Sequence, residues 1–102
     1  MIDLIENHRP ELAALSRKHR VKTLELFGSA ANGAFDPERS NLDFLVDFHL
    51  MEPGQHAKAY FGMLFALEDL FHRKIDLVET PAVNNPYFLK AINQNRTVLY
   101  AA

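Results

Sequence analysis

Apolar and polar residues alternate in three short stretches of this chain, at residues 21–27, 42–48 and 74–79. Alternation with a period of two is typical of a β-strand that buries one of its faces. The middle stretch is the most regular, because four apolar side chains share one side of it: Leu42, Phe44, Val46 and Phe48. Residues 97–100 predict a further short strand at an edge of the sheet.

Helical spacing is clearest at residues 57–72, where apolar side chains recur at steps of three and four: Tyr60, Phe61, Leu64, Leu67 and Phe71. Residues 2–19 have a similar pattern, but Pro10 lacks the backbone N–H that a continuous helix would need. We therefore expect one short helix to about Asn7 and a second helix from near Pro10.

Shorter elements connect these segments. A small helix is expected at residues 29–32, closed by Gly33, and a final helix at residues 85–95, where proline suits the first helical turn. Residues 49–56 contain Pro53-Gly54, a turn-forming pair, and are predicted to be a loop.

This order of elements predicts an α/β fold of the two-layer α+β kind, a small mixed β-sheet packed by helices. The first two strands are too close in sequence for a crossover helix between parallel neighbours, so we expect them to be antiparallel, or the sheet to be mixed. A length of 102 residues predicts a single domain over residues 1–102.

Composition narrows the possible functions. The chain has no cysteine, which removes disulfides, thiolate metal sites and thiol catalysis from consideration. A net charge of −2 and a pI near 6.2 argue against bulk electrostatic binding of nucleic acid. We expect no membrane span, and the acidic N-terminal residues do not resemble a signal peptide, so the expected location is the cytoplasm.

Acidic and amide side chains on two of the strands are the candidate chemistry. Asn41 and Asp43 are two residues apart and so point to the same face, and Asp76 lies on the third strand. If the second and third strands are neighbours, the carboxylates converge into a set of oxygen ligands suited to Mg²⁺. Gly28 and Ser29, between the first strand and the small helix, could hold a phosphate. Metal beside phosphate predicts phosphoryl or nucleotidyl transfer.

The segment LFGSAANGAFDPERSNLDFLVDF resembles the signature of the nucleotidyltransferase fold of the DNA polymerase β superfamily. Almost the whole chain is similar to the minimal nucleotidyltransferases, the antitoxins paired with HEPN-type toxins. The resemblance implies that Gly28 and Ser29 bind the nucleotide, that Asp43 and Asp76 hold Mg²⁺, and that ATP donates AMP to a tyrosine of a helical toxin partner. Asp76 is then the candidate base for the acceptor hydroxyl.

Asn41 stands where that family usually has its first acid. An amide oxygen can bind Mg²⁺ but adds no negative charge to the site. Two functions follow: an adenylyltransferase that uses Asn41 with Asp43 and Asp76, or a module with a weakened site that neutralises its toxin by binding. The family often has a basic residue after Gly-Ser, and Arg39 is the nearest cation here.

Several other side chains have simpler expected roles. Glu25 is expected on the surface, with a place beside the acids of the second and third strands as the alternative. Phe61, Phe65 and Phe71 are expected in the core, with an exposed partner surface as the alternative. The five histidines lack the spacing of metal ligands. Tyr87 and Tyr100 are expected to pack rather than to accept AMP. Whether the chain forms a homo-oligomer is left open by the sequence.

Overall fold

The computed structural model describes residues 2–32, 36, 38, 41–80, 86, 87, 90 and 96–102. These residues form a four-stranded sheet in the order β3-β2-β1-β4. The strands are β1 (Val21–Phe27), β2 (Leu42–Phe48), β3 (Ile75–Glu79) and β4 (Thr97–Ala101). The helices are α1 (Asp3–Glu6), α2 (Arg9–Lys18), α3 (Ser29–Asn32) and α4 (Pro53–Phe71).

The sheet is mixed, as predicted. Strand β1 pairs antiparallel with both β2 and β4, whereas β2 and β3 are parallel. The connection from β1 to β2 is too short for a parallel crossover, but α4 supplies that crossover between β2 and β3. Strand β4 lies at one edge, which confirms the predicted edge strand.

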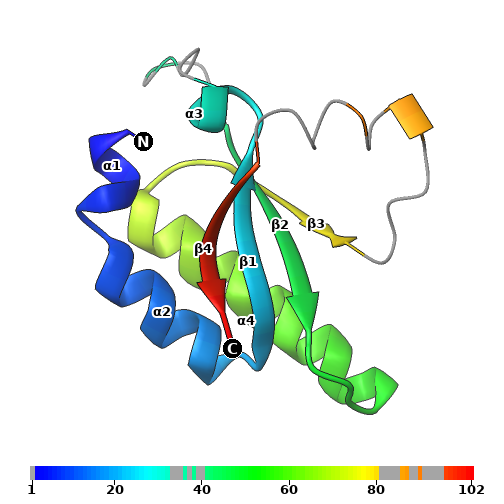
Figure 1. The fold of residues 1–102 in the computed structure, drawn as a ribbon. Helices are drawn as coiled ribbons and strands as arrows, with labels where there is room; N and C mark the ends of the chain where they lie inside the picture. The colour runs from blue at the N-terminus through cyan, green and yellow to red at the C-terminus, as the bar shows by residue number, and fades with distance from the viewer. Residues whose placement is uncertain are drawn as a thin grey trace.

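Helices α1, α2 and α4 lie on the same face of the sheet (Figure 1). Pro10 lies at the start of α2, where its missing N–H costs nothing, and Glu11 occupies the first turn. Arg17 and Lys18 occupy its last turn, where the helix dipole favours positive charge. The predicted break before Pro10 is therefore confirmed.

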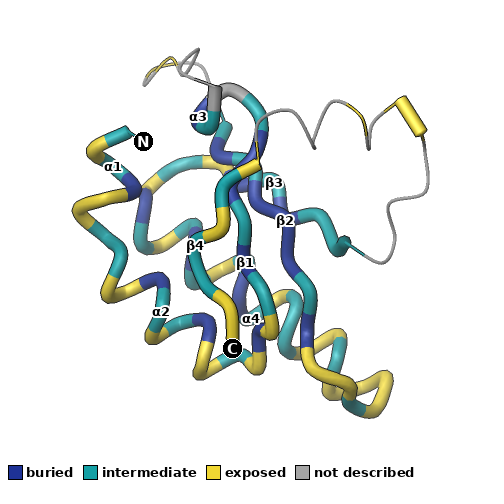
Figure 2. Tube along the Cα trace, viewed as in Figure 1, coloured by how far each residue is buried: buried dark blue, intermediate teal, exposed yellow. Residues whose placement is uncertain are grey.

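The core lies between this helix layer and the sheet, as the buried segments in Figure 2 show. The helices contribute the buried side chains Ile5, Leu12, Met63, Leu67 and Phe71, and the apolar sides of the strands supply the rest. The ring of Phe71 stacks on Phe44 with centroids 6.1 Å apart. A smaller group on the opposite face of the sheet joins Phe27, Leu45 and Val78.

Helix α4 begins at Pro53, so the predicted loop at residues 49–56 is wrong in its second half. Pro53 and Gly54 are common in turns, but proline is also favoured at the first position of a helix because its fixed φ suits that position. The helix ends at His72, which adopts the left-handed conformation with φ 53°.

Two of the phenylalanines predicted for the core lie on the surface instead. Phe61 is 51% exposed and Phe65 is 57% exposed, whereas Phe71 is buried as predicted. The rings of Phe61 and Phe65 lie one helical turn apart with centroids separated by 6.1 Å. The apolar face of α4 is wider than the surface that the sheet can cover, and these two rings lie beyond it.

Three predictions fall wholly or partly outside the described residues: Gly33, Arg39 and most of the helix predicted at residues 85–95. Within that helix Pro86, Tyr87 and Lys90 are helical. Tyr87 is largely exposed, whereas Tyr100 packs against the core. No helix within the described part of the chain is long and apolar enough to cross a membrane.

Candidate active site

The turn after β1 contains Gly28, and two features of the structure require a glycine at this position. Gly28 has φ 72°, a conformation that residues with a side chain rarely adopt. A Cβ atom built on Gly28 would overlap the Asp43 carboxylate. Both observations require glycine here, and they place the turn in direct contact with one of the predicted acids.

The sheet register brings the predicted acids together. Asp43 is paired with Phe27 across the antiparallel β1–β2 ladder and with Asp76 across the parallel β2–β3 ladder. Residues opposite one another in a ladder point to the same face. The two carboxylates therefore lie side by side, on the face of the sheet opposite the helix layer.

Asn41 joins this pair from the residue before β2. Its Nδ2 donates a hydrogen bond of 3.2 Å to Oδ2 of Asp76. The structure thus brings together the predicted trio Asn41, Asp43 and Asp76. We name these residues the acid cluster.

Without a cation, the two carboxylates of the acid cluster repel each other when both are ionised. Burial, followed by the hydrogen bond and the negative charge of Asp76, raises the pKa of Asp43 to about 6. Adjacent carboxylates resist simultaneous ionisation unless a positive charge lies between them. Carboxylate and amide oxygens are the donors that Mg²⁺ accepts, so the chemistry of the cluster fits this ion. In the described part of the chain, however, no group of three His, Cys, Asp or Glu side chains gathers at one point.

Ser29 begins α3 directly after the glycine turn. The turn is closed by a hydrogen bond of 3.1 Å from the Ala31 N–H to the Gly28 carbonyl. The backbone of Ser29 is therefore one residue from the contact between Gly28 and Asp43.

A cavity of about 520 Å³ opens beside the acid cluster at the edge strand β3. Its lining includes Asp43 and Asp76 together with Phe27, Val78 and Tyr60. A volume of this order is typical of small-ligand sites. The cavity gives a substrate access to the two carboxylates.

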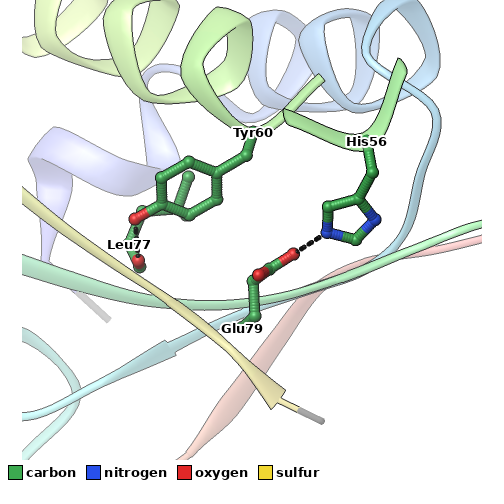
Figure 3. A network of polar contacts seen from close by, with 4 residues as sticks. All are labelled: His56, Tyr60, Leu77 and Glu79. Atoms are coloured by element: carbon green, nitrogen blue, oxygen red, sulfur yellow. Dashed lines mark hydrogen bonds and ion pairs between the residues drawn. The ribbon is translucent and has the colours of Figure 1, made fainter. Parts of the chain in front are cut away.

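Tyr60 is a residue of this site that sequence reasoning treated only as part of an apolar helix face. Its hydroxyl donates a hydrogen bond of 2.6 Å to the backbone carbonyl of Leu77, the residue after Asp76 (Figure 3). Burial, followed by the charges of Glu79 and Asp76, raises the pKa of the Tyr60 hydroxyl. The sequence did contain a signal for this contact, because Tyr60 carries the hydroxyl on an otherwise apolar helix face. A buried tyrosine hydroxyl needs a polar partner.

A second contact fastens the far end of β3 to α4. Nε2 of His56 and the Glu79 carboxylate are in direct contact, and Figure 3 shows them beside the Tyr60 contact. The His56 ring also packs edge-on against Phe48 at a centroid distance of 5.4 Å. Tyr60 and His56 thus hold the strand that carries Asp76.

Glu25 was expected on the surface, and that expectation is wrong. Its side chain is only 12% exposed and forms an ion pair with Arg96, which precedes β4. Glu25 is opposite Leu45 in the sheet, so it shares the face of Asp43. The basic partner comes from 71 residues further along the chain, a distance that local pattern does not reveal.

The structure has paired acids on adjacent strands beside a glycine turn, the arrangement from which the sequence predicted nucleotidyl transfer. The family model described as "Nucleotidyltransferase domain" matches residues 5–99. The chain belongs to this nucleotidyltransferase domain family.

Similar proteins carry names of the same class. "Putative protein adenylyltransferase MJ0128" of Methanocaldococcus jannaschii is 34% identical over 93 residues, which cover 91% of this chain and 88% of the relative.

Solved structures share the fold at low sequence identity. A toxin–antitoxin structure with AMP-PNP superposes with TM-score 0.68 at 17% identity, over 92% of this chain and 73% of that one. A structure of a tri-AMPylated HEPN toxin of Shewanella oneidensis in complex with an MNT antitoxin superposes with TM-score 0.65 at 14% identity. The match covers 96% of this chain and 73% of that one. The predicted fold, that of the minimal nucleotidyltransferases, is confirmed.

Proposed function

We propose that this chain is a Mg²⁺-dependent adenylyltransferase that moves AMP from ATP to a hydroxyl group of a partner protein. The observation that carries the proposal is the register of β2 and β3, which sets Asp43 against Asp76 beside the Gly28 turn. Family membership supports nucleotidyl transfer, and the name of the similar archaeal protein supports a protein as the acceptor.

Each residue of the site has a proposed role. Gly28 and Ser29 bind the phosphates of ATP, and Asp43 and Asp76 hold Mg²⁺. Asn41 contributes its amide oxygen, since the hydrogen bond to Asp76 uses the amide nitrogen. When bound, the metal neutralises charge that develops on the transferring phosphoryl group. Asp76 accepts the proton of the acceptor hydroxyl.

The proposed acceptor is a helical toxin of the HEPN type. The support comes from fold neighbours, one of which is an MNT antitoxin in complex with an AMPylated HEPN toxin. Phe61 and Phe65 are exposed side by side on α4, and exposed apolar groups of this size are common in protein interfaces.

Transfer of label from ATP tests this proposal. The chain is incubated with ATP labelled at the α-phosphate, Mg²⁺ and the protein encoded by the neighbouring gene, and label on that protein is measured. We expect Mg²⁺-dependent label that disappears in Asp43→Ala and persists in Asp47→Ala, a matched control on the same strand and face. A labelled partner in the Asp43→Ala reaction would contradict the proposed site.

A second function, neutralisation of the toxin by binding alone, is favoured by one observation. Asn41 adds no negative charge to the acid cluster, so the cluster has one charge fewer than three carboxylates would give. If this function is correct, wild-type chain and toxin form a stable complex without label transfer. Label transfer by Asn41→Asp but not by wild type would then identify the missing charge as the reason.

A further inference from the structure

A second cavity lies at the opposite end of the sheet from the acid cluster. Gly28 follows the end of β1, whereas this cavity is lined by Lys18, His19 and Arg20, which precede the start of β1. Residues after β2 and in the first three turns of α4 complete the lining: Met51, Gln55, Lys58, Ala59 and Gly62. The cavity has a volume of about 350 Å³. We name it the cationic pocket.

The lining of the cationic pocket carries charge of only one sign. Lys18, Arg20 and Lys58 contribute three positive charges, and no carboxylate lines the cavity. In the part of the chain that the structure describes, none of these three side chains forms an ion pair. The whole chain has a net charge of −2, so this gathering does not reflect a generally basic protein. A concave surface with one sign of charge concentrates the electric field inside it.

Helix dipoles account for part of this arrangement but not for all of it. Lys18 lies in the last turn of α2, where the dipole favours a cation. Lys58 lies in the second turn of α4, beyond the first turn in which a helix dipole acts, so the dipole does not account for a cation there. Lys58 lines the cavity together with Lys18 and Arg20. An anion in the cavity would offset the mutual repulsion of these three cations.

The backbone at Arg20 is unusual for a residue with a side chain. Arg20 has φ 59°, and its carbonyl accepts a hydrogen bond of 3.0 Å from the His49 N–H. A left-handed residue directly after the C-cap is a common helix ending, although glycine is usual there because the conformation is unfavourable for a residue with a side chain. Here Arg20 lies between α2 and β1 and lines the cationic pocket.

His19 lies against α4 because position 62 has no side chain. A Cβ atom on Gly62 would lie 2.9 Å from both Cε1 and Nδ1 of the imidazole. Burial, followed by the charge of Lys18, lowers the pKa of His19. The polar lining residues His19, Gln55, Lys18, Arg20 and Lys58 all carry groups that can donate hydrogen bonds to an anion.

We propose that the cationic pocket binds a small anion of the phosphate class, with Lys18, Arg20 and Lys58 as its charge partners. Inorganic phosphate and pyrophosphate fit the observations best, because no phenylalanine or tyrosine lines the cavity to stack on a base. Lysine and arginine are the side chains that bind phosphate oxygens through charge-assisted hydrogen bonds. This site is separate from the acid cluster and needs no metal.

NMR titration of the intact chain tests the proposal. Sodium pyrophosphate is added to ¹⁵N-labelled protein in EDTA at constant ionic strength, with sodium phosphate and sodium chloride as parallel titrations. We expect saturable shifts of the His19, Gln55 and Gly62 amides with both phosphate compounds, and a raised pKa for the His19 imidazole. Chloride gives no saturable shift. Shifts confined to Gly28 and Asp43, or shifts that never saturate, would overturn the proposal.

Matched charge variants separate the pocket from general electrostatics. Lys18→Gln with Lys58→Gln removes two lining charges, and we expect the affinity for pyrophosphate to fall at least about tenfold. The control variant, Arg17→Gln with Lys22→Gln, removes two exposed charges that do not line the cavity. Arg17 lies in α2, as Lys18 does. Equal weakening in both double variants would contradict a specific site. Because the titration of the unaltered chain needs no variant, it decides the question even if a variant is unstable.

Discussion

At the scale of single residues, Gly28 makes the most restrictive contact of the candidate site. Its positive φ disfavours any residue with a side chain, and a Cβ atom at this position would overlap the Asp43 carboxylate. We expect Gly28→Ala to lower the free energy of unfolding by at least about 1–2 kcal/mol, measured by urea denaturation, and to abolish AMP transfer. Gly54→Ala is the matched control, because a Cβ there meets nothing within 4 Å and stability should not fall.

The carboxyl of Asp43 predicts how stability depends on pH in metal-free protein. Folding raises its pKa to about 6 from a value near 4, so between these values the folded chain binds more protons than the unfolded chain. The contribution of Asp43 to stability is therefore present at low pH and is lost as the pH rises from about 4 to about 6. Chemical denaturation in EDTA checks this, and the loss should shrink in Asp43→Asn. A loss of equal size in that variant would assign the effect to other groups.

Ser16 is a buried polar residue of the helix layer. It is fully buried in α2, and its Oγ has no hydrogen-bond partner among the described residues. Ser16→Ala removes an unsatisfied hydroxyl and improves helix propensity, so we expect a gain of about 0.5–1.5 kcal/mol in the free energy of unfolding. A thermal melt measures it, and a lower melting temperature would show that the hydroxyl has a partner in solution.

At the scale of elements, β3 is the least supported strand of the acid cluster, because it is an edge strand held by β2 on one side. The hydrogen bond from Tyr60 to the Leu77 carbonyl fixes it to α4. We expect Tyr60→Phe to cost about 0.5–1.5 kcal/mol of stability and to speed amide hydrogen exchange in β3 more than in β1. Exchange that accelerates equally in both strands would argue against a local role for this bond.

Most elements could be predicted from the sequence, because their patterns are local. Alternation located β1 and β2, and the short loop between them was enough to predict an antiparallel or mixed sheet. The convergence of Asp43 and Asp76 also followed, once the third strand was placed beside the second.

The features that the sequence did not reveal depend on contacts between distant segments. Glu25 is mostly shielded from solvent and pairs with Arg96, which lies 71 residues further along the chain. Phe61 and Phe65 are exposed because the sheet covers only part of α4. The start of α4 was missed for a different reason, since Pro53-Gly54 suits both a turn and a helix N-terminus.

At the scale of the whole molecule, the two ends of the sheet differ in charge. The acid cluster and the glycine turn occupy one end, and the cationic pocket occupies the other. The first end suits a metal with a nucleotide, and the second suits an anion without a metal. The helix layer connects the two ends, because α4 contributes Tyr60 to the first cavity and Lys58 to the second.

The rate of AMP transfer to the proposed HEPN-type partner, measured in isosteric variants of the acid pair, tests the central claim most directly. Asp43→Asn and Asp76→Asn keep the shape of the site and remove one charge each, and Asp47→Asn is the control on the same strand. We predict that both acid-pair variants lose at least about 100-fold in rate, while the control stays near the wild-type rate. Wild-type rates in both acid-pair variants would contradict the assignment of Asp43 and Asp76 as the site of transfer.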